Sequence, residues 1–107
     1  MPRVNLSRWD ELPLEKITEM VARKVVARGP VVLAQAYFKK GAVVPLHAHP
    51  ADVAVYVLQG ALRAHVDRED VTVREGEVLI IPADAAHQVE SLDDTFVMTF
   101  TSDQVRR

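Results

Sequence analysis

The stretch GAVVPLHAHPADVAVYVLQG, residues 41–60, places two histidines one residue apart, between a proline and an apolar run that ends on a glycine. Side chains at positions i and i+2 of a strand point the same way, so His47 and His49 can converge on one point while Ala48 faces away. This is the geometry of a metal chelate. A His-x-His pair on its own is also compatible with a surface pair or a hydrogen-bonded structural pair, so the surrounding sequence has to distinguish them.

Length and composition limit the possible organisation of the chain. Its 107 residues, 49% of them apolar, suffice for one compact domain but not for two with separate cores, so we expect one domain over residues 1–107. The 13 basic and 15 acidic residues give a net charge of −2 without a basic stripe, which argues against a nucleic-acid partner. No apolar run reaches the length of a signal peptide or membrane span, so we expect a cytoplasmic protein with no membrane partner.

Short apolar runs rich in Val, Ile, Phe and Tyr follow one another from residue 20 onward, separated by turn residues. Many short strands at this spacing indicate an all-β sandwich or barrel. In residues 61–67 apolar and polar residues alternate, so His65 is expected to face solvent together with Arg63.

The four histidines matter more because the chain has no cysteine. A metal site must then be built from imidazoles and carboxylates. With His65 set aside, His87 is the remaining imidazole that can join His47 and His49. Neutral imidazoles suit Fe, Mn, Zn, Cu and Ni, and a set of three would leave positions open for water or substrate.

The spacing of these residues resembles the two-part signature of the cupin superfamily. In residues 41–60, the first cupin motif is matched at Gly41, His47, His49 and Gly60. In residues 76–91, the second motif is matched at Gly76, Pro82 and His87, while Asp84 stands at its second glycine and Ser91 at its asparagine. The resemblance supports the three histidines as ligands of one divalent transition metal.

The resemblance also implies a fold and a partner. The fold is the double-stranded β-helix, or cupin jelly roll, with a short N-terminal extension and the metal near one mouth of the barrel. The chain is similar to small single-domain bacterial cupins of the RmlC-like type, in which residues 1–30 would form the N-terminal segment and first strands. Such proteins commonly pair by strand exchange or sheet packing, which implies a homodimer.

One position departs from the first motif. The cupin glutamate, seven residues before Gly60, is replaced by Val53. The neighbouring Asp52 points to the opposite face on a regular strand, so it could reach a metal only through a bulge or turn. A three-histidine site is therefore the preferred interpretation, with Asp52 as a weaker fourth candidate. Val53 and Val55 would then form an aliphatic pocket wall.

Three further residues are pocket candidates. In layout the chain is similar to the small cupins of pectin degradation that act on unsaturated uronates, but Met98 stands where those carry an acidic residue. This replacement predicts a drier pocket and argues against transfer of that activity. Gln35 and Tyr37 share one face of their strand and could also line the pocket. No residue is identified as a catalytic acid or base.

Two classes of function remain open. The first is a metal-dependent enzyme, an oxygenase, isomerase or lyase, acting on a small oxygen-rich substrate that chelates the ion. Three-histidine sites occur in cupins resembling cysteine dioxygenase and the β-diketone-cleaving dioxygenases, which makes oxygenation one hypothesis within this class. The second is a non-catalytic barrel that binds a small ligand or acts as a scaffold. A metal-free hydrolase is disfavoured because the sequence has no Ser-His-Asp order.

Overall fold

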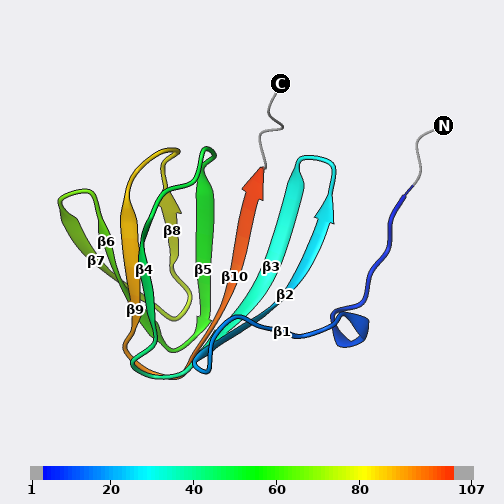
Figure 1. Ribbon diagram of the computed structural model, residues 1–107, viewed down its shortest axis with the longest axis horizontal. Helices are drawn as coiled ribbons and strands as arrows, with labels where there is room; N and C mark the ends of the chain where they lie inside the picture. Colours follow the sequence, from blue (N-terminus) through cyan, green and yellow to red (C-terminus); the bar gives the residue numbers. More distant parts are fainter. Residues whose placement is uncertain (1–3, 103–107) are drawn as a thin grey trace.

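Two antiparallel β-sheets face each other in the computed structural model, which describes residues 4–102 (Figure 1). The larger sheet has six strands in the order β1-β2-β3-β10-β5-β8, and the smaller has four in the order β4-β9-β6-β7. The strands are β1 (Glu15–Lys16), β2 (Val21–Arg28), β3 (Val31–Phe38), β4 (Val43–His47), β5 (Val53–Gln59), β6 (Ala61–Val66), β7 (Glu69–Arg74), β8 (Val78–Ile81), β9 (His87–Ser91) and β10 (Thr95–Ser102).

Consecutive strands mostly lie in different sheets. The chain changes sheet at each step from β3 to β6, and again at each step from β7 to β10. This crossing pattern is the double-stranded β-helix predicted from the two motifs, so the all-β jelly-roll prediction is confirmed. Within residues 4–102, no helix is long and apolar enough to cross a membrane.

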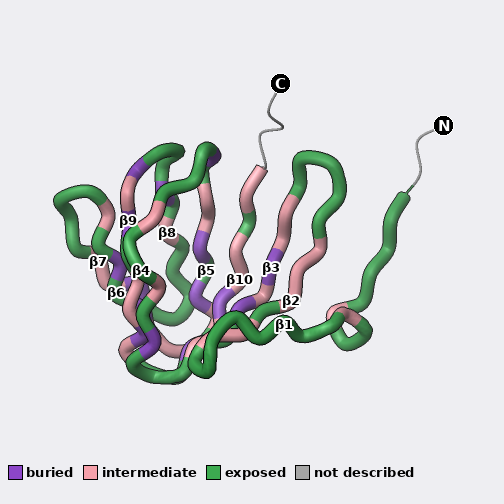
Figure 2. The backbone as a smooth tube through the Cα atoms, viewed as in Figure 1, coloured by how far each residue is buried: buried purple, intermediate pink, exposed green. Residues whose placement is uncertain are grey.

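The core lies between the sheets, where apolar side chains alternate with outward-facing ones along each strand. Val57 and Val97 are register partners on β5 and β10, and they are 0% and 1% exposed. Burying one such side chain contributes about 1.5–3 kcal/mol. Figure 2 shows buried stretches on β3, β5 and β10, whereas no residue from 4 to the end of β2 is buried. Strands β1 and β2, at one edge of the larger sheet, therefore contribute little to the core.

The barrel has two unlike ends, which we call the glycine end and the histidine end. The turns of the glycine end contain Gly41, Gly60 and Gly76, whose φ angles are 88°, 89° and 85°. The histidine end is formed by the β4–β5 loop, residues 48–52, and the β8–β9 loop, residues 82–86. Each motif thus starts at the glycine end, reaches the histidine end and returns.

The outer faces of the two sheets differ in polarity. Strands β6, β7 and β9 of the smaller sheet present polar, exposed side chains outward, namely Arg63, His65, Asp70 and Gln88, whereas its edge strand β4 exposes Val43 and Leu46. The larger sheet presents apolar side chains that are 40–57% exposed, namely Tyr56, Val78, Ile80 and Phe100. We call this second surface the apolar face.

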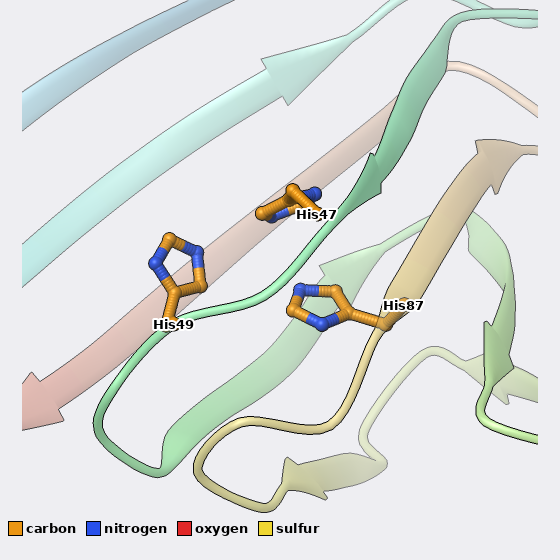
Figure 3. A group of neighbouring side chains, drawn as sticks. All are labelled: His47, His49 and His87. Atoms are coloured by element: carbon orange, nitrogen blue, oxygen red, sulfur yellow. The ribbon is translucent and has the colours of Figure 1, made fainter.

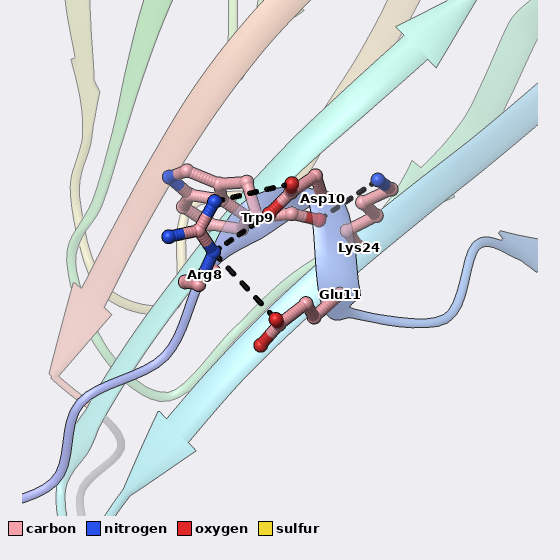
Figure 4. Close-up of polar contacts among 5 residues, drawn as sticks. All are labelled: Arg8, Trp9, Asp10, Glu11 and Lys24. Atoms are coloured by element: carbon pink, nitrogen blue, oxygen red, sulfur yellow. Dashed lines mark hydrogen bonds and ion pairs between the residues drawn. The ribbon is translucent and has the colours of Figure 1, made fainter.

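The N-terminal extension is tied to the outer side of β2. It contains the 3-10 turn η1 (Trp9–Glu11), and the ammonium group of Lys24 on β2 donates a hydrogen bond of 2.8 Å to the carbonyl oxygen of Trp9 (Figure 4). Arg8 pairs with Asp10 at 3.3 Å and with Glu11 at 3.6 Å. The short extension predicted from the sequence is present, and residues 1–3 lie outside the described part of the chain.

Candidate metal centre

The histidine end brings three imidazoles together from two segments of the chain (Figure 3). His47 ends β4 and His87 opens β9, and the two are register partners in the smaller sheet. The register of β4 shifts between Val44 and His47, so this strand carries a bulge. Because of the extra residue, Val44 pairs with Val89 and His47 pairs with His87, so both lie on the inner face. In a regular strand, two residues three positions apart would point to opposite faces. His49 follows in the β4–β5 loop.

The three rings are close enough to share one ion. One nitrogen from each of His47, His49 and His87 lies within 4.8 Å of the other two. The ring centroid of His47 is 4.9 Å from that of His49 and 4.2 Å from that of His87. The centroids of His49 and His87 are 5.7 Å apart. Among the described residues, this potential ligand group contains no carboxylate.

Hydrogen bonds fix the tautomers of two of the three histidines. The Nδ1 atom of His47 lies 2.8 Å from the carbonyl oxygen of Pro45, and that of His87 lies 2.9 Å from the carbonyl oxygen of Ala85. A carbonyl oxygen can only accept, so each Nδ1 carries the proton and donates it. Each Nε2 is therefore left with a lone pair for a metal. His87 is only 4% exposed, which holds its ring in this orientation.

The electrostatics of the group also favour neutral ligands. The pKa of His49 is lowered from its usual value of 6.5, first by burial and then by the neighbouring His47 and His87. Burial disfavours the imidazolium form of His49, and so would any positive charge on the two neighbouring rings. The lowered pKa therefore favours the neutral form of His49, which is the form that binds a metal. The residues present thus fit a divalent transition metal in donor type, protonation and spacing.

Asp52 lies with the neighbouring loop rather than with the histidine group. Its Oδ1 atom accepts a hydrogen bond of 2.8 Å from the backbone N–H of Ala83. Val53, at the position of the motif glutamate, pairs with Ile81 and packs against the core. Asp52 is thus not placed to complete the ligand set, and the side chain on the inner face at this level is aliphatic.

The other pocket candidates separate into two groups. Val55 shares the inner face with Val53, as expected. Gln35 and Met98 are register partners, and Met98 also pairs with Tyr56, which belongs to the apolar face.

Tyr37 lies on the same outer surface as Met98, with its ring stacked on Phe96 at 4.7 Å between centroids. The reason is strand alternation, because Val97 is buried and its neighbours in sequence must face outward. Gln35, Tyr37 and Met98 therefore do not lie on the face of the histidines.

Two hydroxyl-bearing residues near the site were missed by the sequence reasoning. Thr99 pairs with Val55, and Thr101 pairs with Val53, so both lie on the inner face of β10. The Oγ1 atom of Thr101 donates a hydrogen bond of 2.9 Å to the carbonyl oxygen of Asp52. The alternation in TFVMTFT contained the signal, but it required knowing that Val97 faces inward.

Comparisons with known proteins agree with this architecture. The family model for the cupin domain matches residues 35–102, and the chain therefore belongs to the cupin family. No curated protein sequence matches it significantly. The predicted membership of the cupin superfamily is thereby confirmed.

Several solved structures share the fold. KdgF from a Halomonas species aligns with a TM-score of 0.85 at 24% identity, covering 95% of this chain and 96% of that one. An RmlC-like cupin from Shewanella frigidimarina gives 0.83 at 20% identity, with coverages of 95% and 94%. A predicted oxalate decarboxylase from Thermotoga maritima gives 0.81 at 20% identity, with coverages of 94% and 100%. At these identities the likeness concerns the fold.

Proposed function

We propose that this cupin is a metal-dependent enzyme that holds one divalent transition metal on His47, His49 and His87. The observation that carries the proposal is the convergence of the three rings, with Nδ1 of two of them bonded to backbone carbonyls. Fe, Mn, Zn, Cu and Ni all accept such ligands. The reaction class is oxygenase, isomerase or lyase.

The ligand set and the pocket wall suggest the kind of substrate. A bound metal would supply Lewis acidity and open coordination positions. Three neutral imidazoles leave the positive charge of the ion uncompensated, which favours a small substrate that chelates through oxygen atoms. Val53 and Val55, on the inner face of β5, favour a substrate with an aliphatic part beside those oxygens.

A non-catalytic ligand-binding barrel is the second candidate. It is favoured by the absence of a carboxylate from the histidine group in the described residues, since such a group would be the natural proton carrier. The same metal site would then retain a small oxygen-rich ligand without converting it. A scaffold role without ligand would need no aligned imidazoles.

Metal content is the first test. The protein is stripped with a chelator and reconstituted separately with each of the five metals, and we expect about one ion per chain with at least one of them. Less than a few tenths of an ion with every metal would exclude the site. Oxygen uptake by the iron form with diketones or thiols then separates an oxygenase from a binder, because a binder takes up ligand once and consumes no oxygen.

We also propose that the protein forms a homodimer through the apolar face. Exposed contiguous apolar surface of this kind marks an interface, whereas the polar outer face of the smaller sheet suits solvent. A second copy of the chain fits it because a two-fold axis pairs a surface with itself, so the apolar face covers its own counterpart. A soluble cytoplasmic dimer is the assembly we expect.

The mass in solution tests the dimer. We expect Ile80→Glu to shift the protein toward the monomer, because the charge would be buried at the interface. The matched control Gln88→Glu, on the outer face of the smaller sheet, should leave the mass unchanged. Light scattering coupled to gel filtration measures both, and a monomeric wild-type protein would contradict the proposal.

A further inference from the structure

The two loops of the histidine end are joined by two hydrogen bonds. The backbone N–H of Asp84 donates to the carbonyl oxygen of His49 at 2.7 Å. The backbone N–H of Ala83 donates to Oδ1 of Asp52 at 2.8 Å. One loop carries His49 and the other leads into His87, so these bonds set how far apart the two rings stand.

Asp52 is anchored on its other side as well. Its carbonyl oxygen accepts the hydroxyl hydrogen of Thr101 at 2.9 Å, and Thr101 belongs to β10 of the larger sheet. Through its main chain Asp52 is thus fixed to the sheet, and through its side chain it holds the β8–β9 loop. It is the link between a rigid strand and the loop that precedes His87.

His49 depends on this backbone arrangement more than the other ligands do. His47 and His87 are each oriented by a bond from Nδ1 to a carbonyl oxygen. Among the described residues, the ring nitrogens of His49 have no such partner. Its ring position therefore follows the β4–β5 loop, which the bonds from Ala83 and Asp84 hold in place.

We infer that Asp52 is a positioning residue of the metal centre: its carboxylate binds the backbone N–H of Ala83 and keeps His49 and His87 at chelating separation. This inference rests on the proposed metal site. Outer partners that bond directly to a metal ligand change metal affinity by about 10–100-fold in other proteins, and Asp52, which acts through the loop backbone, should fall at the lower end of that range. Asp52 acts here through loop geometry, without contacting the ion and without relying on its charge.

Two substitutions distinguish geometry from charge. Asp52→Asn keeps an Oδ1 acceptor for the N–H of Ala83 but removes the negative charge, whereas Asp52→Ala removes both. Asp94→Ala is the matched control, because Oδ1 of Asp94 accepts the backbone N–H of Lys40 at 2.9 Å at the glycine end. It deletes the same kind of exposed carboxylate-to-backbone bond far along the strands from the histidines.

The experiment is a Co²⁺ titration of the stripped full-length protein, followed by the visible absorption of the bound ion. Asp52→Ala should weaken Co²⁺ binding by about 10-fold and alter the spectrum. Asp52→Asn and Asp94→Ala should bind and absorb as the wild-type protein does. An unchanged Asp52→Ala overturns the inference, and so does an Asp52→Asn that loses as much affinity as Asp52→Ala.

Amide hydrogen exchange of the metal-free proteins keeps this test separate from the proposed function. The amides of Ala83 and Asp84 should exchange faster in Asp52→Ala than in the wild type, and near the wild-type rate in Asp52→Asn and Asp94→Ala. Equal exchange in all four proteins overturns the loop link. If wild type binds no Co²⁺ or other metal, the proposed metal centre fails, and the positioning role fails with it whatever the exchange rates.

Discussion

The glycine end and the histidine end of the barrel belong to the same strands but use their polar groups differently. At the glycine end, Ser91 and Thr95 are 2% and 4% exposed, and their hydroxyls bond to each other and to turn carbonyls. At the histidine end, one nitrogen from each of His47, His49 and His87 lies within 4.8 Å of the other two. The first arrangement satisfies polar groups within the fold, and the second leaves them available to a ligand. Substitutions at the two ends should therefore affect different properties.

The largest expected effect is loss of metal at the histidine end. His47→Ala and His87→Ala should each abolish most metal uptake, because two remaining imidazoles chelate poorly. His65→Ala is the control, since His65 faces solvent and pairs with Asp70 at 2.7 Å on the outer face. Metal per chain after reconstitution measures the difference. An equal loss at His65 would show that the outer face, not the histidine end, binds the ion.

At the glycine end, stability should change instead. A Cβ atom added at Gly60 would stand 2.5 Å from the carbonyl oxygen of Asp94, whereas one added at Gly41 meets nothing within 4 Å. Both glycines have positive φ, so Gly41→Ala costs about 1–2 kcal/mol of backbone strain. Gly60→Ala adds a clash with backbone and should cost about 2–5 kcal/mol. Urea unfolding measures both, and equal losses would mean that the close contact relaxes freely.

A carboxylate restored at the histidine end should strengthen the site. Val53→Glu puts an anionic oxygen donor at the position of the motif glutamate, and it should tighten divalent metal binding by about 10-fold through added charge. Val53→Leu controls for size and should leave the affinity as it is. Competition against a metal-binding dye gives the affinities. Unchanged binding by Val53→Glu would indicate that residue 53 does not face the histidines.

The smallest effect concerns the backbone of the β8–β9 loop. Asp84 stands at a motif glycine and has a φ of 67°, which aspartate tolerates better than most residues. Asp84→Gly should therefore change the free energy of unfolding by less than about 1 kcal/mol. Asp84→Val should lose about 1–2 kcal/mol, because a β-branched residue resists this conformation. Thermal unfolding compares them, and a well-tolerated valine would argue against the strain.

Whether the outer side of a strand is polar or apolar explains which predictions from the sequence succeeded. Strand β6 alternates polar and apolar residues, so the outward position of His65 was predicted and is confirmed by its exposure of 51%. The glycine spacing of the two motifs likewise predicted which histidines meet. Strand β10 carries Thr99 and Thr101 on its inner face and Phe100 on its outer face, so its outer side is the more apolar one. Polarity along the strand therefore gave no sign that Met98 faces outward, and Met98 was expected inside where Val97 lies.

The position of Asp52 could not be predicted for a different reason. Its carboxylate bonds to Ala83, which lies 31 residues further along the chain. Such a contact depends on how two loops approach each other after the barrel has closed. Local periodicity carries no information on it, whereas the glycine turns at the other end are specified by residues within each turn.

X-ray absorption of the zinc-loaded protein tests the central claim most directly, because it counts the atoms around the ion. The three-histidine site predicts three imidazole nitrogens at about 2.0–2.1 Å, completed by light atoms from solvent. The multiple-scattering signal of the imidazole rings should decrease by one ring in His49→Ala. A first shell with fewer than two imidazoles in the wild-type protein would contradict a metal centre built on His47, His49 and His87.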